Sequence, residues 1–517
     1  MACFISGKQG GDAQKGRWIF GDICYNLLHI LEEGQMGDTS NMPLVVDLDG
    51  TLTPTDTLLE SLVSLLKHSP VSLLLLPLWL MRGRAGFKDA ISMRVTIDAE
   101  KIPYCAPLLE YLHEEKSRGR QIVLATAAHY TTADQVSMHL GIFDKVLATR
   151  AGDNLKGPAK LKAIQGSVGE AFVYAGDCKA DLPIWKQASA AILVGVSQST
   201  AALVRRQVPI EREYPKQNSG MAVWLRALRV HQWVKNLLLF VPLLTTFEFT
   251  DIYKLGSMAL AFLAFSFAAS ATYIVNDLWD LGSDRSHPRK RLRPFACGAL
   301  PILHGLLVAG MGLVLSLVVA STVSQGFFWM LVTYLVLTSF YSWVIKGYVL
   351  MDVLMLSLLY TIRILAGSVA IGVATSSWLL AFSAFLFLSL ALVKRCAELV
   401  SLKEAGVGAT RGRDYRVSDL VVLWPLGVGA ALCAVVVFGL FISAPETQAR
   451  YATPQMLWLV AIGLVYWMAR LWVKTSRGEM HDDPIVYAVK DRGSRLTVLA
   501  MIGAAMAAFF VTLELQP

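Results

Sequence analysis

The stretch N-D-L-W-D-L-G-S-D-R-S-H-P-R-K-R-L-R-P, residues 276–294, directly follows an apolar run at residues 255–275. On a helix, Asp277, Asp280 and Asp284 lie three or four residues apart, so their side chains line one face. Carboxylates placed in this way suit Mg²⁺, which takes oxygen ligands and is usually shared with substrate phosphates. The stretch therefore indicates a magnesium and diphosphate site at the end of a membrane helix. The alternative is a charged loop that obeys the positive-inside rule.

The composition indicates a membrane protein. Of the 517 residues 55% are hydrophobic and 17% are charged, and the mean hydropathy is +0.50. In soluble proteins about a quarter of all residues are charged. After residue 225 the sequence predicts nine apolar spans near the roughly 20 residues that cross a bilayer. They are residues 232–250, 255–275, 299–320, 326–345, 350–372, 375–394, 418–443, 455–474 and 495–514, and Lys235 and Asn236 make the first the weakest.

The charge pattern predicts the orientation and the compartment. Lys and Arg concentrate in the loops after the second, fourth, sixth and eighth spans. By the positive-inside rule these loops are cytosolic, so we expect a multi-pass protein of the inner (cytoplasmic) membrane. The N-terminal domain and both active sites are then cytosolic. The seven cysteines form no CxxC pair, which argues against structural zinc. No nucleic-acid partner is expected, and a homo-oligomer is left open.

Acidic residues follow two predicted strands of the N-terminal half. A short apolar strand that includes Val45 and Val46 ends in D-L-D-G-T, which places Asp47 and Asp49 after the first strand. A second strand, residues 171–175, ends in G-D-C-K-A-D with Asp177 and Asp181. Ligands at the carboxyl ends of parallel strands form a site in an open α/β sheet. Two further candidates to bind a phosphoryl group are Thr126, after the strand at residues 121–125, and Lys156, with Lys160 as the alternative one turn later.

This half resembles the haloacid dehalogenase superfamily of phosphatases, with all four motifs in order. The resemblance implies a Rossmann-like α/β fold with a helical cap at residues 57–108. It also implies that Asp47 attacks phosphorus while Asp49 protonates the leaving oxygen and then activates water. Mg²⁺ would be held by Asp47, the backbone carbonyl of Asp49 and Asp177, with Asp181 in support. Thr126 and Lys156 would hold the phosphoryl group.

One segment of the expected cap is unusually apolar. Residues 71–81 read V-S-L-L-L-L-P-L-W-L-M and precede Arg82, Arg84 and Lys88. The segment is too short to span a bilayer and contains Pro77. We expect a helix in the core of the cap. The alternative is a segment that rests on the membrane surface and admits a lipid-linked phosphate.

The membrane half resembles the UbiA-type superfamily of prenyltransferases, which agrees with an all-α bundle of nine transmembrane helices. Further motifs narrow the resemblance to the branch of polyprenyl-phosphate phosphoribosyltransferases: H-P-x-K-R-x-R-P at residues 287–294, H-Q-W-V-K-N at 231–236, Tyr341 with Lys346, Asp352, Arg363 and K-R-C-A-E-L at 394–399. A second aspartate-rich motif is incomplete, because Leu356 follows Asp352 by four residues.

This resemblance implies transfer of 5-phosphoribose from phosphoribosyl diphosphate to a polyprenyl phosphate. Mg²⁺ on Asp277, Asp280 and Asp284 would neutralise the leaving diphosphate. The candidates for binding donor or acceptor are Lys235, Asn276, Lys290, Arg291, Arg293, Tyr341, Lys346, Arg363, Lys394 and Arg395. For Lys235, Asp352, Arg363 and Glu398, which lie near membrane depth, an internal ion pair is the alternative.

The two halves together predict a bifunctional enzyme. The phosphatase would remove the 5-phosphate and yield polyprenyl-phosphoryl ribose, a pentose carrier for cell-envelope glycans such as an arabinose donor. The expected division is an N-terminal extension at residues 1–40, a phosphatase domain at 41–200, a linker at 201–225 and a transferase domain at 226–517. The alternatives are an aromatic prenyltransferase fused to a phosphatase, and a lipid-binding membrane scaffold with an inert soluble domain.

Overall fold

The computed structural model describes residues 41–150, 154–215, 220–406, 408, 413–480 and 483–512. The expected N-terminal extension, residues 1–40, lies outside these ranges. The chain forms two compact units. The N-terminal unit comprises the residues up to Val223 together with Leu278–Leu303, and the membrane unit comprises Trp224–Asp277 and the residues from His304 onward. The segment Leu278–Leu303, which carries Asp280 and Asp284, therefore packs with the N-terminal half of the sequence.

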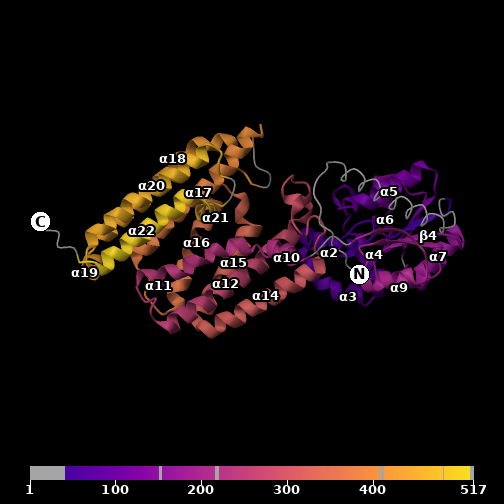
Figure 1. The fold of residues 1–517 in the computed structure, drawn as a ribbon, viewed down its shortest axis with the longest axis horizontal. Coiled ribbons are helices and arrows are strands. Elements are labelled where there is room, and N and C mark those ends of the chain that lie inside the picture. Colours follow the sequence, from indigo (N-terminus) through magenta and orange to yellow (C-terminus); the bar gives the residue numbers. More distant parts are fainter. Residues whose placement is uncertain are drawn as a thin grey trace, which may run out of the picture. The chain divides into compact units, whose positions relative to one another are not determined.

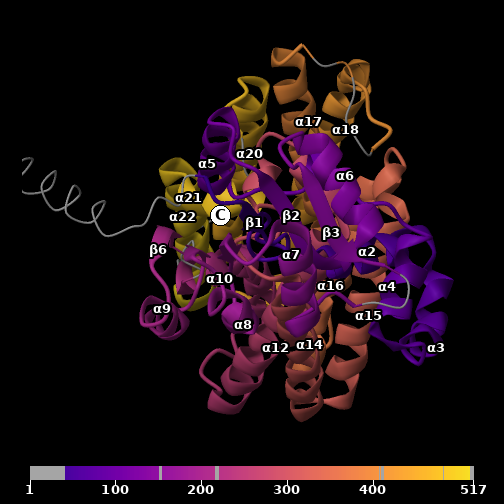
Figure 2. The same ribbon diagram turned by 90° about the vertical axis from the view of Figure 1, so that its right-hand side faces the viewer.

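The N-terminal unit contains one six-stranded sheet in the order β3-β2-β1-β4-β5-β6, and neighbouring strands pair in parallel. Figure 2 shows β1, β2 and β3 side by side. The strands are β1 (Leu44–Val46), β2 (Ile122–His129), β3 (Lys145–Thr149), β4 (Val173–Gly176), β5 (Ala190–Val194) and β6 (Ile210–Tyr214). The predicted strands before Asp47, Thr126 and Asp177 are confirmed, although Thr126 lies within β2 and not at its end.

Helices cover both faces of the sheet, because its strands are apolar on both sides. Leu44 and Val46 of β1 pack with α5 (Ala106–Ser117) and α6 (Tyr130–Leu140), whereas Val45 points to the opposite face. There it packs with α7 (Pro158–Val168), α8 (Leu182–Trp185) and α9 (Gln198–Arg205). The expected linker at residues 201–225 holds the end of α9, all of β6 and part of α10 (Met221–Ala227), so the sheet extends into it.

Between β1 and β2 the chain forms a helical insert, as the sequence predicts for residues 57–108. The insert contains α2 (Thr57–His68), η1 (Pro70–Leu75), α3 (Leu76–Leu80), α4 (Gly83–Ser92) and η2 (Ala99–Lys101). The expectation that residues 71–81 form a core helix is wrong. Trp79 is buried, but Leu74, Leu78 and Met81 are exposed. Pro77 and the change from η1 to α3 prevent one regular helix that could bury a continuous apolar stripe.

The membrane unit is helical. The described residues contain eight helices long and apolar enough to cross a membrane: α12 (Ile252–Trp279), α14 (Ile302–Val323), α15 (Gln325–Trp343), α16 (Met351–Ala370), α17 (Ser377–Glu404), α18 (Leu420–Ser443), α20 (Leu457–Ser476) and α22 (Arg492–Phe510). In Figure 1, α18, α20 and α22 run alongside one another, and the pairs α18–α20 and α20–α22 are in contact.

The first of the nine predicted spans, residues 232–250, differs from the expectation. It is divided between the 3-10 helix η4 (Val230–Phe240) and the short helix α11 (Val241–Thr245), with Pro242 near their junction. Lys235 and Asn236 of η4 are buried. Both side chains find partners inside the unit, because Lys235 contacts Asp483 and Asn236 donates to Ser266, whereas Leu237 and Leu244 of the same segment are about half exposed. The eight remaining predicted spans coincide with the eight helices.

Candidate active sites

Three aspartates meet at the carboxyl edge of the sheet. Asp47 follows β1, and Asp177 follows the adjacent parallel strand β4. The turn after Asp47 needs Gly50, whose φ is +79° and where a Cβ atom would lie 2.2 Å from Oδ2 of Asp177. The carboxylate of Asp49 accepts a hydrogen bond of 2.9 Å from the backbone N–H of Thr57, the first residue of α2. The turn thus places both acids of the D-L-D-G-T motif beside Asp177.

These acids line a cavity of about 490 Å³ between the sheet and the helical insert. Lys156, Lys160 and Asp181 also line it, whereas Thr126 is not among its lining residues. Thr126 is fully buried, and its Oγ1 accepts a hydrogen bond from the backbone N–H of Ala128. The residues that the sequence predicts for the phosphatase site therefore line one cavity, with the exception of Thr126.

Lys160, and not Lys156, contacts Asp47. The Nζ atom of Lys160 lies 2.9 Å from Oδ2 of Asp47 and donates to the hydroxyl of Tyr174 at 2.7 Å. That hydroxyl donates in turn to Oδ1 of Asp181 at 3.0 Å. Lys156 is exposed and lies in the loop before α7, although it lines the same cavity. Lys160 is therefore the lysine that contacts Asp47. Tyr174 was not predicted as a site residue.

Burial sets the protonation of the acids. Burial raises the pKa of Asp49 to about 7, although the hydrogen bond from Thr57 lowers it. Burial also raises the pKa of Asp177 to about 7, and the negative charges of Asp181 and Asp47 add to this increase. The pKa of Asp47 is also raised by burial, although the charge of Lys160 opposes this. A bound cation would stabilise the ionised form of such clustered carboxylates. The donor set therefore fits a divalent metal ion with oxygen ligands.

A residue that the sequence analysis assigned no role also lines this cavity. Lys88 of α4 donates to Oδ1 of Asn154 at 3.2 Å, and burial lowers its pKa. Its partner Asn154 is 66 residues away in sequence, so no local pattern links the two. In the sequence, Lys88 is marked only by its position a few residues after the apolar segment at residues 71–81.

The acidic stretch of residues 276–284 lies across the end of α12 and α13 (Leu281–Arg285). Asn276 donates to the hydroxyl of Ser342 at 3.3 Å. Two of the aspartates are buried and paired with arginine: Asp277 with Arg229, and Asp284 with Arg293 at 2.6 Å. Arg229 was not predicted. Asp277 and its partner Arg229 belong to the membrane unit, whereas Asp284 and Arg293 belong to the N-terminal unit.

The other basic candidates of this region differ in exposure. Lys290 and Arg291 lie in η5 (Lys290–Leu292) and are exposed. Tyr341 and Lys346 are partly buried, at the end of α15 and in η6 (Ile345–Gly347) respectively. Lys290 and Arg291 are therefore accessible to a ligand.

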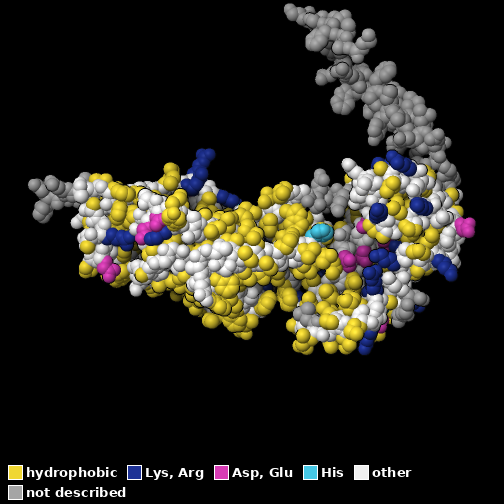
Figure 3. Space-filling model, turned by 90° about the horizontal axis from the view of Figure 1, so that it is seen from below, with side chains coloured by type: hydrophobic (Ala, Val, Ile, Leu, Met, Phe, Trp, Pro, Cys, Tyr) yellow, Lys and Arg dark blue, Asp and Glu magenta, His cyan; other side chains and the backbone are white. Residues whose placement is uncertain are grey.

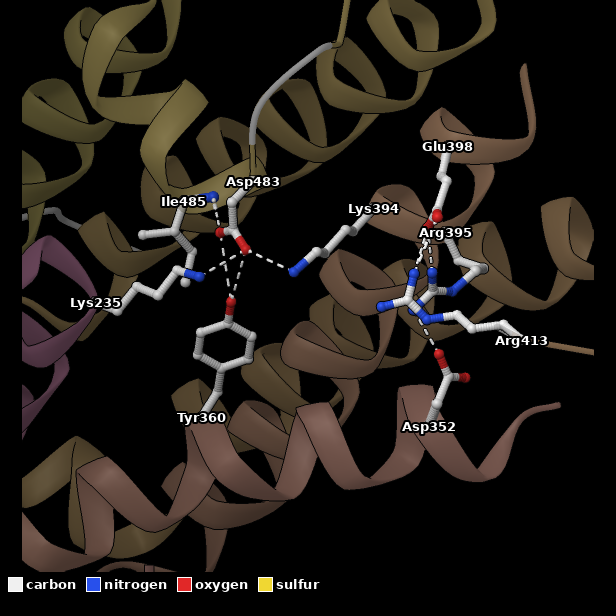
Figure 4. A network of polar contacts seen from close by, with 9 residues as sticks. All are labelled: Lys235, Asp352, Tyr360, Lys394, Arg395, Glu398, Arg413, Asp483 and Ile485. Atoms are coloured by element: carbon white, nitrogen blue, oxygen red, sulfur yellow. Dashed lines mark hydrogen bonds and ion pairs between the residues drawn. The ribbon is translucent and has the colours of Figure 1, made fainter. Parts of the chain in front are cut away.

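Figure 4 shows Lys235 and Lys394 pointing toward one carboxylate, that of Asp483. Their Nζ atoms lie 2.7 and 3.3 Å from its Oδ2, and the hydroxyl of Tyr360 donates to the same oxygen at 3.2 Å. Burial alone would raise the pKa of Asp483, but the two lysines outweigh it and hold the pKa below its usual range. Asp483 is not among the predicted site residues. Its signal was an acid directly before Pro484, where it caps α21 (Pro484–Lys490).

The second group in Figure 4 is an internal ion-pair network. Arg395 is fully buried and contacts Asp352. Asp352 also accepts a hydrogen bond from Tyr415. Glu398 forms ion pairs with both Arg395 and Arg413. Asp352 thus lies in a fully buried ion pair, whereas the side chain of Glu398 is 37% exposed. Arg395, expected to bind substrate, is enclosed by this network.

Arg363 is enclosed in a similar way within α16. Its guanidinium group donates to Oδ1 of Asn236 at 3.1 Å and to the hydroxyl of Tyr334 at 2.7 Å. Only 5% of the residue is exposed. Among the basic candidates of the membrane unit, Lys394 with 37% of its side chain exposed is therefore more accessible than Arg363.

Comparison with known proteins places these residues in a family. A model of the UbiA prenyltransferase family matches residues 238–489. The uncharacterized protein y4nM of Sinorhizobium fredii is 37% identical over 91% of this chain and 90% of its own length. The nodulation protein NoeC of Azorhizobium caulinodans is 36% identical over 54% of this chain and 90% of its own.

A third relative carries the name of an enzyme. The decaprenyl-phosphate phosphoribosyltransferase of Mycolicibacterium smegmatis is 30% identical over 297 residues, which cover 55% of this chain and 92% of that protein. The eight apolar helices agree with an integral membrane protein. Through its C-terminal half, the chain belongs to the UbiA prenyltransferase family of transferases.

Proposed function

We propose that the membrane unit transfers 5-phosphoribose from phosphoribosyl diphosphate to a polyprenyl phosphate. The bond between C1 of ribose and the diphosphate oxygen breaks, and a phosphate oxygen of the lipid forms the new bond to C1. Lys235 and Lys394 would bind phosphate oxygens of the donor, with Asp483 fixing their positions. Support comes from the relative of that name and from the paired acids and arginines of residues 276–293.

The acidic stretch would hold Mg²⁺ through Asp277, Asp280 and Asp284. The ion would supply positive charge to the leaving diphosphate. Arg293, Lys290 and Arg291 are available for the remaining phosphate oxygens. We place both active sites in the cytosol and the helices in the inner membrane, because the basic loops favour that orientation.

For the N-terminal unit we propose a phosphatase of the haloacid dehalogenase type. Asp47 attacks the phosphorus atom of the ribose 5-phosphate, and the bond to the 5-oxygen breaks as Asp49 gives that oxygen a proton. Asp49 then removes a proton from water, which hydrolyses the aspartyl phosphate and releases inorganic phosphate. Lys160 offsets charge on the phosphoryl group and favours the ionised form of Asp47 against the burial that raises its pKa. A pKa of about 7 suits Asp49 to both proton transfers.

A divalent ion would bind Asp47, the backbone carbonyl of Asp49 and Asp177, and Asp181 would support it. The ion would add positive charge against which a phosphate dianion can approach the carboxylate. In this order of events the transferase product is the phosphatase substrate, and polyprenyl-phosphoryl ribose is the final product. The observation that carries the proposal is the meeting of Asp47, Asp49, Asp177 and Lys160 in one cavity of a chain whose other half is a UbiA-family transferase.

The test uses the full-length protein in lipid nanodiscs with polyprenyl phosphate, Mg²⁺ and radiolabelled phosphoribosyl diphosphate. We expect a labelled lipid without its 5-phosphate, and Asp47→Asn should yield the same lipid with the 5-phosphate retained. A wild-type product that keeps its 5-phosphate would contradict the phosphatase step alone. Absence of labelled lipid, with activity only on prenyl diphosphate and an aromatic acid, would contradict the transfer itself.

A further inference from the structure

The helical insert exposes an apolar patch formed by Val71, Leu74, Leu75, Leu78, Leu80 and Met81. Leu74 and Met81 are 81% and 84% exposed, whereas Trp79 turns inward, onto a small core with Leu65 and Ile91 against which Leu76 also packs. In Figure 3 hydrophobic side chains gather on the N-terminal unit, with Lys and Arg side chains close by. A patch of neighbouring large apolar side chains is costly in water unless something covers it.

The patch adjoins the phosphatase cavity. Leu80 belongs to both, and Arg84, Phe87 and Lys88 of the next helix, α4, continue the cavity lining from there. The same cavity contains Asp47 and Asp49. An occupant of the patch would therefore lie beside the entrance through which a phosphate reaches the nucleophile.

The charges around the patch favour an anionic, apolar occupant. Residues 61–88 contain no Asp or Glu, while Arg82, Arg84 and Lys88 follow the patch. Apolar side chains with flanking basic residues are the pattern by which a segment binds the surface of an anionic bilayer. At 11 residues interrupted by Pro77 the segment is too short to cross the bilayer. The same chain carries eight candidate membrane spans, so the protein is expected to be in a bilayer.

We propose that residues 71–81 dock on the lipid bilayer surface and admit a membrane-bound phosphate monoester to Asp47. This inference rests on the proposed phosphatase function and adds the class of substrate: a phosphate whose lipid chain stays in the bilayer. The apolar side chains enter the region below the headgroups, Arg82 and Arg84 contact anionic headgroups, and the phosphoryl sugar enters the cavity past Leu80 and Arg84.

The test compares two substrates on full-length protein in nanodiscs that contain phosphatidylglycerol. One is a short-chain polyprenyl-phosphoryl 5-phosphoribose embedded in the disc, and the other is water-soluble p-nitrophenyl phosphate. In the variant Leu74→Gln/Leu78→Gln/Met81→Gln, kcat/KM for the lipid should fall at least about tenfold because three buried apolar contacts with the bilayer are lost. Turnover of p-nitrophenyl phosphate should stay unchanged, which also shows that the unit is folded.

The matched control is Met138→Gln. Met138 is 82% exposed on α6, outside the patch, so both activities should be unchanged. Equal loss on both substrates, or no loss on either, would overturn the docking surface and leave the proposed function standing. A wild-type protein that hydrolyses p-nitrophenyl phosphate but never the lipid would instead overturn the proposed function.

A second measurement identifies the occupant directly. A photoreactive benzophenone side chain at position 74 should cross-link to radiolabelled phosphatidylglycerol in the nanodisc, whereas the same group at position 138 should not. Cross-linking from position 74 to a second copy of the chain, in place of lipid, would overturn the proposal.

Discussion

Arg285 donates two hydrogen bonds to the carboxylate of Glu60, at 2.6 and 2.8 Å, and the two side chains are only 9% and 8% exposed. Glu60 lies in α2, whose first residue, Thr57, donates to the carboxylate of Asp49. Arg285 lies one residue after Asp284. The pair therefore joins α2, whose first residue contacts Asp49, to the segment that carries two of the proposed diphosphate-site aspartates.

Replacing Glu60 with Ala should destabilise the N-terminal unit by about 3–5 kcal/mol, because it leaves the buried Arg285 without its partner. Thermal unfolding measures this, and Glu60→Ala/Arg285→Ala should recover part of the loss. The control is Asp98→Ala, since Asp98 and Lys101 form a pair whose side chains are about half exposed and worth less than about 1 kcal/mol. Equal effects of Glu60→Ala and Asp98→Ala would contradict the prediction.

Lys160→Met should reduce phosphatase turnover by about 10²–10³, the usual loss when a group that stabilises the transition-state charge is removed. Lys160 is 2.9 Å from Asp47, whereas Lys156 is exposed. Lys156→Met is therefore the matched control and should change turnover by less than about tenfold. The measurement is hydrolysis of p-nitrophenyl phosphate at saturating Mg²⁺. A larger loss from Lys156→Met than from Lys160→Met would reverse the assignment.

Much of the fold follows from patterns that are local in sequence. The apolar residues before Asp47 and Asp177 predict two adjacent strands, and eight apolar runs predict eight of the helices. Hydropathy alone does not show that residues 232–250 are divided between η4 and α11, because an apolar run has the same hydropathy whether or not its helix is continuous. There Lys235 finds its carboxylate 248 residues away, so its burial is visible only in the fold.

The sites were predictable to the extent that their motifs are local. Asp47, Asp49, Asp177 and Asp181 come from two short motifs, and all four line one cavity. Lys156 and Lys160 could not be separated by sequence, because the start of α7 at Pro158 decides that Lys160 lies on the helix and Lys156 in the loop before it. Arg363 and Arg395 look like substrate ligands in sequence, yet partners on other helices enclose them.

In metal-free protein the N-terminal unit should become less stable as the pH rises from 4 to 7. Asp49 and Asp177 have pKa values of about 7 in the folded state, so between these pH values the folded state binds more protons than the unfolded state. Hydrogen exchange in β1 and β4 in the presence of EDTA reports this unit alone. Added Mg²⁺ should stabilise the unit more at pH 8 than at pH 5. Exchange protection that rises with pH in EDTA would contradict the raised pKa values.

Lys394 and Arg395 are neighbours in sequence with opposite expected roles. Lys394→Met should raise KM for phosphoribosyl diphosphate by about 10–100-fold, the equivalent of one charge-assisted hydrogen bond, with little change in the melting temperature. Its side chain is 37% exposed, and Lys235 still balances the charge of Asp483. Arg395→Met should instead lower the melting temperature, because Asp352 is left buried without its cation. Transfer kinetics and thermal melting of both variants in nanodiscs separate the two roles. An increase in KM for Arg395→Met without loss of stability would place the donor site at Arg395, and an unchanged KM for Lys394→Met would remove Lys394 from it.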